Sequence, residues 1–534
     1  MNQKTSHSQR RLSKKGIVKS LLLGMLYLNY AHAGNELEDD SYFPAARMSF
    51  GSQANVRLFD EAANTTAHQK GMWSTSGNWP LYAIHMALLP NGNVITYGTD
   101  ESGRGLGLAY DVWTPSQGFT DASHNTLDIT TDTNVFCSAQ QLLGNGSLLI
   151  SGGDQRPNGI NGAGIKSANV FNPNDNSMSL TGEMNQQRWY PTLTTMPNGD
   201  ILIHGGRIDK ETPTTLPELY SQTSGTWSQL HGADSPDVYS VKGWYYPRSF
   251  VNNKGNVVFI KGNDNGVYEL DAYKTTANGQ GGINHKINTG TGDFKFFYPT
   301  VSYASGKVLA FKEGKKVYSI NINNFSSKRL ANIPSERIWS DATLLANGEV
   351  LVSGGSSVRQ DLDSAHFTAE VYNPANNTWR TTEAAQKARL YHSSAVLLPS
   401  GAVLVAGGGP PGPIYQLNAE MYYPDYLFDA NGNWATRPTI TSITTNASYD
   451  KNISVKYSGN RKIERITMVK LGSTTHSWNM GQIFREVNFK ERQNNRLVIG
   501  SGQLTPQKMT PGYYMVFVID ADGVPSEAKI IKLS

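Results

Sequence analysis

A pattern of two apolar strands joined by an x-Gly turn recurs along most of the chain. One copy reads YPTLTTMPNGDILIHGG over residues 190–206, and another reads WSDATLLANGEVLVSGG over residues 339–355. The turn glycines lie 42 to 56 residues apart and are Gly92, Gly146, Gly199, Gly255, Gly306, Gly348 and Gly401. Asn-Gly or Ser-Gly between alternating apolar runs is typical of a β-hairpin. Each copy therefore predicts a pair of antiparallel strands.

Aromatic residues downstream of several copies indicate further strands of the same unit. Examples are Phe171, the pair Tyr220 and Trp227, and the pair Tyr372 and Trp379. Four short strands repeated at this period are typical of a propeller blade, and Gly-Gly followed by Tyr and Trp is similar to the kelch repeat. A β-helix or a pair of sandwiches is the alternative, but the long, even period favours an all-β, seven-bladed kelch-like β-propeller. Its closure would remove exposed sheet edges.

The repeat pattern ends near residue 430, and a different β pattern follows. From Pro438 the chain alternates through short strands such as RITMVKL and YYMVFVID, with no helical period. About a hundred residues of this kind predict an immunoglobulin-like β-sandwich. We therefore expect a propeller over residues 34–433 and a C-terminal sandwich over residues 434–534.

The first 33 residues have the pattern of a signal peptide. Six Lys and Arg residues and no acidic residue precede or flank a short apolar core at Leu21–Leu28, and Ala31-His32-Ala33 resembles a cleavage site. The pair Arg10-Arg11 is compatible with a twin-arginine signal, which exports folded proteins. An uncleaved anchor is the alternative. We expect export, so the protein would be secreted or lie in the periplasm or at the cell surface.

Composition and charge exclude several classes of protein. Of 534 residues, 38% are apolar and 17% charged, which argues against a disordered or coiled-coil chain. The net charge is +4, but without the six basic residues of the first segment 41 basic residues face 43 acidic ones. No basic stripe remains to indicate nucleic acid as a partner. No apolar run reaches the roughly 18 residues of a membrane span.

The single cysteine, Cys137, excludes a disulfide scaffold and occupies a repeated position. Nine residues before the turn glycine stand Ala83, Cys137, Tyr190, Tyr246, Trp339 and His392, and Tyr298 stands eight before. Equivalent blade positions form a ring about a propeller axis, so these side chains are expected to gather at one mouth. Aromatics there can also be packing residues, a lone histidine can be a satisfied hydrogen-bonding group, and an exported thiol can be inert or reactive.

Four motifs in this order resemble a known family. They are VFCSAQQ with Cys137, RWYPT with Tyr190, ARLYHSS with Tyr391 and His392, and STTHSWNMGQ with His476. Their order and setting are similar to those of the copper radical oxidases, the family of galactose oxidase and the glyoxal oxidases. The RWYP and HSWNM settings are more similar to the glyoxal oxidase branch. The resemblance extends over nearly all of the chain after the signal peptide.

The resemblance implies a metal site and a cofactor made from two side chains. Tyr190 would bind one copper ion and, joined through its ring to the sulfur of Cys137 by a thioether, would carry the radical. His392 and His476 would be nitrogen ligands, and Tyr391 would be the axial ligand that takes the substrate's proton. Two-electron oxidation needs this second one-electron store, because one copper ion cycles only one electron.

The same resemblance implies that His476 reaches the copper on a hairpin along the propeller axis. The arms are expected to be RITMVKL and VNFKE. Two departures stand out. Ile208 occupies the position where galactose oxidase has a tryptophan over its cross-linked tyrosine. Either Tyr190 is less shielded here or another aromatic residue covers it, with Trp244 and Trp339 as the candidates. The spacing before Arg485 differs from that of relatives, which leaves no role for it to carry over.

The function expected from these residues is that of an exported mononuclear copper radical oxidase. It would oxidise an aldehyde or a primary alcohol, free or on a carbohydrate, and reduce O₂ to hydrogen peroxide. We expect a monomer with no nucleic-acid partner and no membrane span. The alternative is a non-catalytic carbohydrate- or protein-binding kelch propeller.

Overall fold

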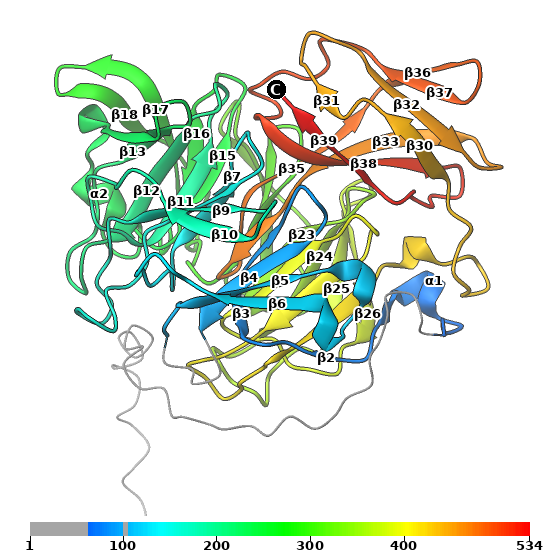
Figure 1. Ribbon diagram of the computed structural model, residues 1–534, viewed down its shortest axis with the longest axis horizontal. Helices are drawn as coiled ribbons and strands as arrows, with labels where there is room; N and C mark the ends of the chain where they lie inside the picture. Colours follow the sequence, from blue (N-terminus) through cyan, green and yellow to red (C-terminus); the bar gives the residue numbers. More distant parts are fainter. Residues whose placement is uncertain (1–61, 100–104) are drawn as a thin grey trace, which may run out of the picture. The chain divides into compact units, whose positions relative to one another are not determined.

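The computed structural model describes residues 62–99 and 105–534 (Figure 1). The predicted signal peptide, residues 1–33, lies outside the described residues. Strands dominate, and the helices are single turns: α1 (Ala67–Lys70), α2 (Pro236–Tyr239) and the 3-10 turns η1 (Pro115–Gln117), η2 (Asp121–Ser123), η3 (His231–Ala233) and η4 (Asp425–Leu427). The all-β class is confirmed. Among the described residues, no helix is long and apolar enough to cross a membrane.

Seven sets of antiparallel strands follow one another along the described chain from residue 72 to residue 423. The first three are β3 (Tyr82–Leu88), β4 (Val94–Thr99), β5 (Ala109–Trp113), β6 (His124–Asp128); β7 (Ala139–Leu142), β8 (Leu148–Ser151), β9 (Ala168–Asn172), β10 (Ser177–Leu180); and β11 (Trp189–Thr195), β12 (Ile201–Arg207), β13 (Glu218–Ser221), β14 (Thr226–Gln229). The next three are β15 (Arg248–Val251), β16 (Val257–Ile260), β17 (Gly266–Thr276), β18 (Gly279–Asn288); β19 (Thr300–Ala304), β20 (Lys307–Lys312), β21 (Lys316–Asn321), β22 (Ser326–Arg329); and β23 (Ile338–Leu344), β24 (Val350–Ser356), β25 (Thr368–Asn373), β26 (Thr378–Ala384).

The seventh set combines the end of this region with its beginning. It contains β27 (Ser393–Leu397), β28 (Val403–Gly407), β29 (Asn418–Tyr423), and β1 (Met72–Trp73) and β2 (Gly77–Asn78). Met72 pairs with Tyr423, and Gly77 pairs with Ala419. The strand β27 also lies beside β3, so the last set is joined to the first. The sequence pattern did not predict the pairing of β1 and β2.

The predicted hairpins form because their glycines adopt a backbone that other residues disfavour. Gly199, between β11 and β12, has a φ of 93°, and Gly348, between β23 and β24, has a φ of 89°. Only glycine takes such angles without a steric penalty from Cβ. The first strand of each hairpin is almost fully buried, as β11 and β23 show. The first strand of each hairpin therefore lies in the interior of the protein.

Three of the sets each contain a buried arginine–glutamate pair. Arg188 binds Glu218 at 3.0 Å, Arg337 binds Glu370 at 3.4 Å, and Arg389 binds Glu420 at 2.9 Å. Each arginine also donates to the carbonyl of the first glycine in its Gly-Gly pair, Gly205, Gly354 or Gly407. Each arginine thus connects the segment before the first strand with the end of the second strand and, through the glutamate, with the third strand.

The C-terminal region has a separate core and contributes strands to two sheets. One contains β30 (Thr439–Ile443), β32 (Ile453–Ser458), β37 (Arg496–Ile499) and β36 (Phe489–Arg492). The other contains β31 (Asn446–Ala447), β39 (Lys529–Leu533), β38 (Gly512–Asp520) and β33 (Ile463–Lys470), which pairs with β35 (Trp478–Val487). This second sheet continues through β35 into the first and fifth sets of strands.

A hairpin from this region runs among the first strands of the seven sets. Its arms are β34 (Ser473–Thr475) and β35, and the orange strand β35 extends among the blue, cyan and yellow sheets (Figure 1). β34 pairs with β3, and β35 pairs in parallel with β19. We call Ser473–Val487 the axial hairpin. The prediction that VNFKE forms the return arm is wrong, because the arm begins at Trp478 and β36 pairs in the other sheet.

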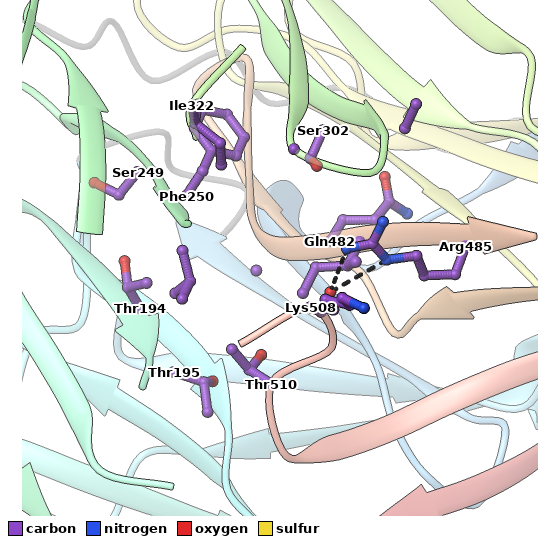
Figure 2. Close-up of a pocket in the computed structure, with 15 residues that line it drawn as sticks. Thr194, Thr195, Ser249, Phe250, Ser302, Ile322, Gln482, Arg485, Lys508 and Thr510 are labelled. Atoms are coloured by element: carbon purple, nitrogen blue, oxygen red, sulfur yellow. Dashed lines mark hydrogen bonds between the residues drawn. The ribbon is translucent and has the colours of Figure 1, made fainter. Parts of the chain in front are cut away.

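A small pocket marks the place where β35 passes the first strands (Figure 2). Gln482 and Arg485 line it together with Thr195 and Ser249. The Arg485 guanidinium donates to the carbonyl of Lys508, at 3.3 Å from Nε and 3.0 Å from Nη2. Arg485 therefore helps to fix the axial hairpin to the C-terminal region.

Replacing Glu420 with glutamine removes the charge opposite buried Arg389 while keeping the shape of the side chain. We expect a loss of about 3–5 kcal/mol of unfolding free energy, because breaking a buried pair leaves one charge uncompensated. The control Glu486→Gln breaks an exposed pair with Arg465 and should cost less than about 1 kcal/mol. Urea unfolding followed by tryptophan fluorescence measures both. Equal midpoints for the two variants would contradict the role of the buried pair.

Candidate metal centre

Five of the seven residues at the repeated position share an unusual backbone conformation. Their φ angles are 57° for Cys137, 65° for Tyr190, 37° for Tyr246, 60° for Trp339 and 67° for His392. Left-handed angles are uncommon for residues with a bulky side chain. Ala83 and Tyr298 do not have left-handed angles. Tyr298 instead directs its hydroxyl to Glu336, to which it donates at 2.5 Å. The fold thus imposes one local strain at equivalent positions.

Backbone hydrogen bonds hold the strand starts of neighbouring sets together. The amide of Tyr190 donates to the carbonyl of Cys137 at 3.0 Å, and the amide of Tyr246 donates to the carbonyl of Tyr190 at 2.9 Å. Cys137 and Tyr190 therefore stand on adjacent sets, as the repeat register predicts.

The structure brings together all five residues that the family resemblance singles out. The Sγ atom of Cys137 lies 3.6 Å from Nε2 of His476, and that nitrogen lies 2.9 Å from Nε2 of His392. The hydroxyl oxygens of Tyr190 and Tyr391 are 3.4 Å apart. The Tyr391 and His392 rings stack with centroids 3.8 Å apart. All five side chains are buried.

Hydrogen bonds at the outer nitrogens orient the two imidazoles. Nδ1 of His392 lies 2.5 Å from the carbonyl oxygen of Pro410, and Nδ1 of His476 lies 2.5 Å from Oγ1 of Thr475. A carbonyl only accepts, so Nδ1 of His392 carries the proton and its Nε2 has a free lone pair. The Thr475 hydroxyl can accept in the same way from His476.

The facing nitrogens fit a metal ion. Two lone pairs 2.9 Å apart repel unless a cation lies close to both. Burial lowers the pKa of His392 to about 3 and that of His476 well below its ordinary value, so a proton does not fill this role near neutral pH. Sγ of Cys137 and one nitrogen of each histidine lie within 4.8 Å of one another. Imidazole and phenol donors are ligands that copper(II) accepts.

Arg248 fixes the tip of the axial hairpin through hydrogen bonds to backbone carbonyls. Its Nη2 donates to the carbonyl oxygens of His476 at 3.2 Å and Phe296 at 2.7 Å, and its Nη1 donates to the carbonyl of Tyr246 at 3.1 Å. One guanidinium thus joins the hairpin to two neighbouring sets. Arg248 was not predicted from the sequence, although an arginine at the start of a buried inner strand, two places after Tyr246, was a possible signal.

The aromatic residues beside Tyr190 differ from those predicted. Trp189 stacks on it with centroids 4.4 Å apart, and Tyr245 lies at 4.6 Å. Trp244 is farther away, at 6.0 Å, and Trp339 packs 4.4 Å from Tyr391 instead. Trp189 and Tyr245 are therefore the nearest covers of the Tyr190 ring, with Trp244 behind them.

Comparisons with known proteins show which family the chain resembles. The family model "Galactose oxidase-like, Early set domain" matches residues 437–533, and "Glyoxal oxidase N-terminus" matches residues 299–430. The resemblance to the galactose oxidase and glyoxal oxidase family is confirmed. Galactose oxidase from Gibberella zeae is 26% identical over 522 residues, which cover 90% of this chain and 74% of that one.

Two further relatives extend the resemblance. Aldehyde oxidase GLOX1 of Arabidopsis thaliana is 25% identical, over 76% of this chain and 72% of that one. A solved structure titled "Novel fungal alcohol oxidase with catalytic diversity among the AA5 family, in complex with copper" has a TM-score of 0.75 at 20% identity. It covers 87% of this chain and 100% of that chain, so this similarity shows the galactose oxidase-like fold.

Thr475 offers a test of the metal site. Its hydroxyl contacts Nδ1 of His476, the nitrogen that faces away from His392. We expect Thr475→Val to weaken copper(II) binding about 10- to 100-fold, since partners of metal-binding imidazoles orient the rings and fix the tautomer. The control Thr474→Val alters the neighbouring buried threonine, whose hydroxyl donates to the carbonyl of Met86 at 3.5 Å. Competition titration with a chelator measures both. Equal copper affinity in the two variants would contradict the assignment.

Proposed function

We propose that the chain is an exported mononuclear copper radical oxidase with a cofactor formed from Cys137 and Tyr190. It oxidises an aldehyde or a primary alcohol, including that of a carbohydrate, and reduces O₂ to hydrogen peroxide. Relatives named galactose oxidase and aldehyde oxidase support an oxidase. The observation that carries the proposal is the convergence of a thiol, two phenols and two imidazoles from three sets of strands and the axial hairpin.

The same proposal includes the domain organisation. We infer that the seven sets of strands are the blades of a kelch-type propeller over residues 34–433, because β27 lies beside β3. The two C-terminal sheets would form an immunoglobulin-like sandwich over residues 434–534. Residues 1–33 would direct export to the periplasm, the cell surface or the medium.

Four side chains would hold the copper ion. His392 and His476 offer Nε2 atoms, and Tyr190 and Tyr391 offer hydroxyl oxygens 3.4 Å apart. Bound copper supplies a one-electron acceptor and a Lewis acid for the substrate oxygen. Tyr391 takes the proton of the substrate hydroxyl, since its phenol is the second oxygen donor at the site.

Tyr190 would supply the second one-electron store that the reaction needs. A primary alcohol plus O₂ gives an aldehyde plus hydrogen peroxide, and a hydrated aldehyde plus O₂ gives an acid plus hydrogen peroxide. Trp189 and Tyr245 cover the Tyr190 ring and exclude water from it. A sulfur substituent on the ring would spread the unpaired electron and make the radical easier to form.

The thioether itself forms by a balanced oxidation. The S–H bond of Cys137 and one ring C–H bond of Tyr190 break, and a C–S bond forms. Two electrons and two protons leave, and O₂ accepts them as hydrogen peroxide. The non-catalytic binding propeller, the alternative from the sequence, gives no reason for five buried donors to converge at one place.

Mass analysis after aerobic copper loading tests the cofactor. We expect a peptide pair containing Cys137 and Tyr190, resistant to reducing agents and two hydrogens lighter than the separate peptides. An intact Cys137 that remains open to alkylation after unfolding would contradict the proposal.

Variants connect the cofactor to activity. Cys137→Ala and His476→Ala should lose peroxide production while the fold persists, because one removes the thioether and the other a nitrogen ligand. The control Tyr246→Phe removes a hydroxyl that donates to the carbonyl of Ser138 at 2.9 Å and is not one of the five donors, and it should keep the cross-link. Peroxide assay and circular dichroism measure these outcomes. Wild-type turnover in Cys137→Ala would refute the role of the thioether.

A further inference from the structure

An arginine beside the proposed copper site has no role in the chemistry described above. Arg359 lies on the loop that follows β24, and it is half-buried. Its guanidinium carbon is 5.7 Å from the ring centroid of Phe296 and 5.8 Å from that of Phe297. Phe296 packs 5.7 Å from Trp339, which in turn packs on Tyr391. A short chain of rings thus connects Arg359 with Tyr391.

The charge of Arg359 has no compensating partner among the described residues. The side chain makes no ion pair and no hydrogen bond there, and its buried Nε has no acceptor. Burial lowers the pKa of Arg359, and the nearby Tyr391 and Tyr245 oppose this shift, in keeping with the ring contacts that connect Arg359 with Tyr391. A half-buried, unpaired cation is costly in the folded state. A ligand that brings a negative charge would remove this cost.

A second cation lies against the same aromatic ring. Nζ of Lys242 is 5.6 Å from the centroid of Phe296 and 5.1 Å from that of Trp244. Burial and, to a smaller extent, the charge of Arg359 together lower the pKa of Lys242 to about 8. Two cations therefore flank Phe296 although they repel each other.

The residue after Arg359 adds an unsatisfied donor. The buried Nε2 of Gln360 has no hydrogen-bond partner. The Gln360 side chain lies against Gly412, where an added Cβ would meet its Oε1 at 3.1 Å. Gly412 follows Pro410, whose carbonyl orients His392. The loop that carries Arg359 and Gln360 thus contacts the loop whose Pro410 carbonyl orients His392.

We propose that Arg359, assisted by Lys242 and Gln360, binds a carboxylate of the substrate, so that the substrate class is a short aldehyde or primary alcohol that carries a carboxylate. The inference rests on the proposed oxidase function. A guanidinium matches a carboxylate with two parallel hydrogen bonds, whereas the hydroxyls of a neutral sugar leave the positive charge of Arg359 uncompensated. The Phe296 ring then packs against the carbon chain of the substrate.

The reaction remains the one proposed above. A hydrated aldehyde that carries a carboxylate reacts with O₂ to give the dicarboxylic acid and hydrogen peroxide. The two electrons pass from the aldehyde carbon to O₂, and the carboxylate at Arg359 takes no part in bond making or breaking. Arg359 acts as a specificity-determining residue through a charge-assisted contact.

Matched substrates test the inference. Glyoxylate and 4-oxobutanoate are each compared with their methyl esters in the copper-loaded enzyme by a peroxide assay. The acids should have the higher kcat/KM in the wild type. Arg359→Met should raise KM for the acids about 10- to 100-fold, the effect of losing a charge-assisted hydrogen bond, and leave kcat/KM for the esters nearly unchanged. Arg496→Met, an exposed arginine of the C-terminal region, is the control and should change neither.

A binding measurement separates this inference from the proposed function. Calorimetric titration of the protein as purified with succinate, which has no aldehyde or alcohol, should detect binding in the wild type and its loss in Arg359→Met. Equal effects of Arg359→Met on acids and esters, or faster oxidation of the esters by the wild type, would overturn the inference. If no aldehyde or alcohol yields peroxide, the proposed function fails, and the titration alone then decides whether Arg359 binds a carboxylate.

Discussion

The pairing of the axial hairpin with the first strands is the interaction on which the site depends. β34 joins β3 and β35 joins β19, so the turn at His476 is held by backbone hydrogen bonds on both sides. Without this pairing His476 would have no fixed position opposite His392. The second arm also explains why the C-terminal region packs into the main core through residues such as Phe484.

Local strain and buried charge are the costs of building the site in this way. Cys137, Tyr190 and His392 take left-handed backbone angles, and His476 does so as well, with a φ of 49°. Such angles persist only where the surroundings determine them strongly. The Arg–Glu pairs behind the strand starts and the three hydrogen bonds of Arg248 supply that support. The strain is thus concentrated where the donor side chains have to turn inward.

The sequence predicted features that local chemistry determines. Turn glycines such as Gly199 marked the first hairpin of each set, and the register between them placed Cys137 next to Tyr190. The family motifs located His476. Features that depend on distant pairing were missed: the strands β1 and β2, the return arm at Trp478, and the stacking of Trp189 on Tyr190. Arg359 was missed because only the fold brings its loop beside Tyr391.

The central claim is that the fold assembles a copper site next to a Cys137–Tyr190 thioether. A crystal structure of the protein after aerobic copper loading, with anomalous data at the copper edge, tests it most directly. We predict a single anomalous peak bound by Nε2 of His392 and of His476, and continuous electron density from Sγ of Cys137 to the ring of Tyr190. Copper bound elsewhere, together with a separate thiol and phenol, would contradict the account.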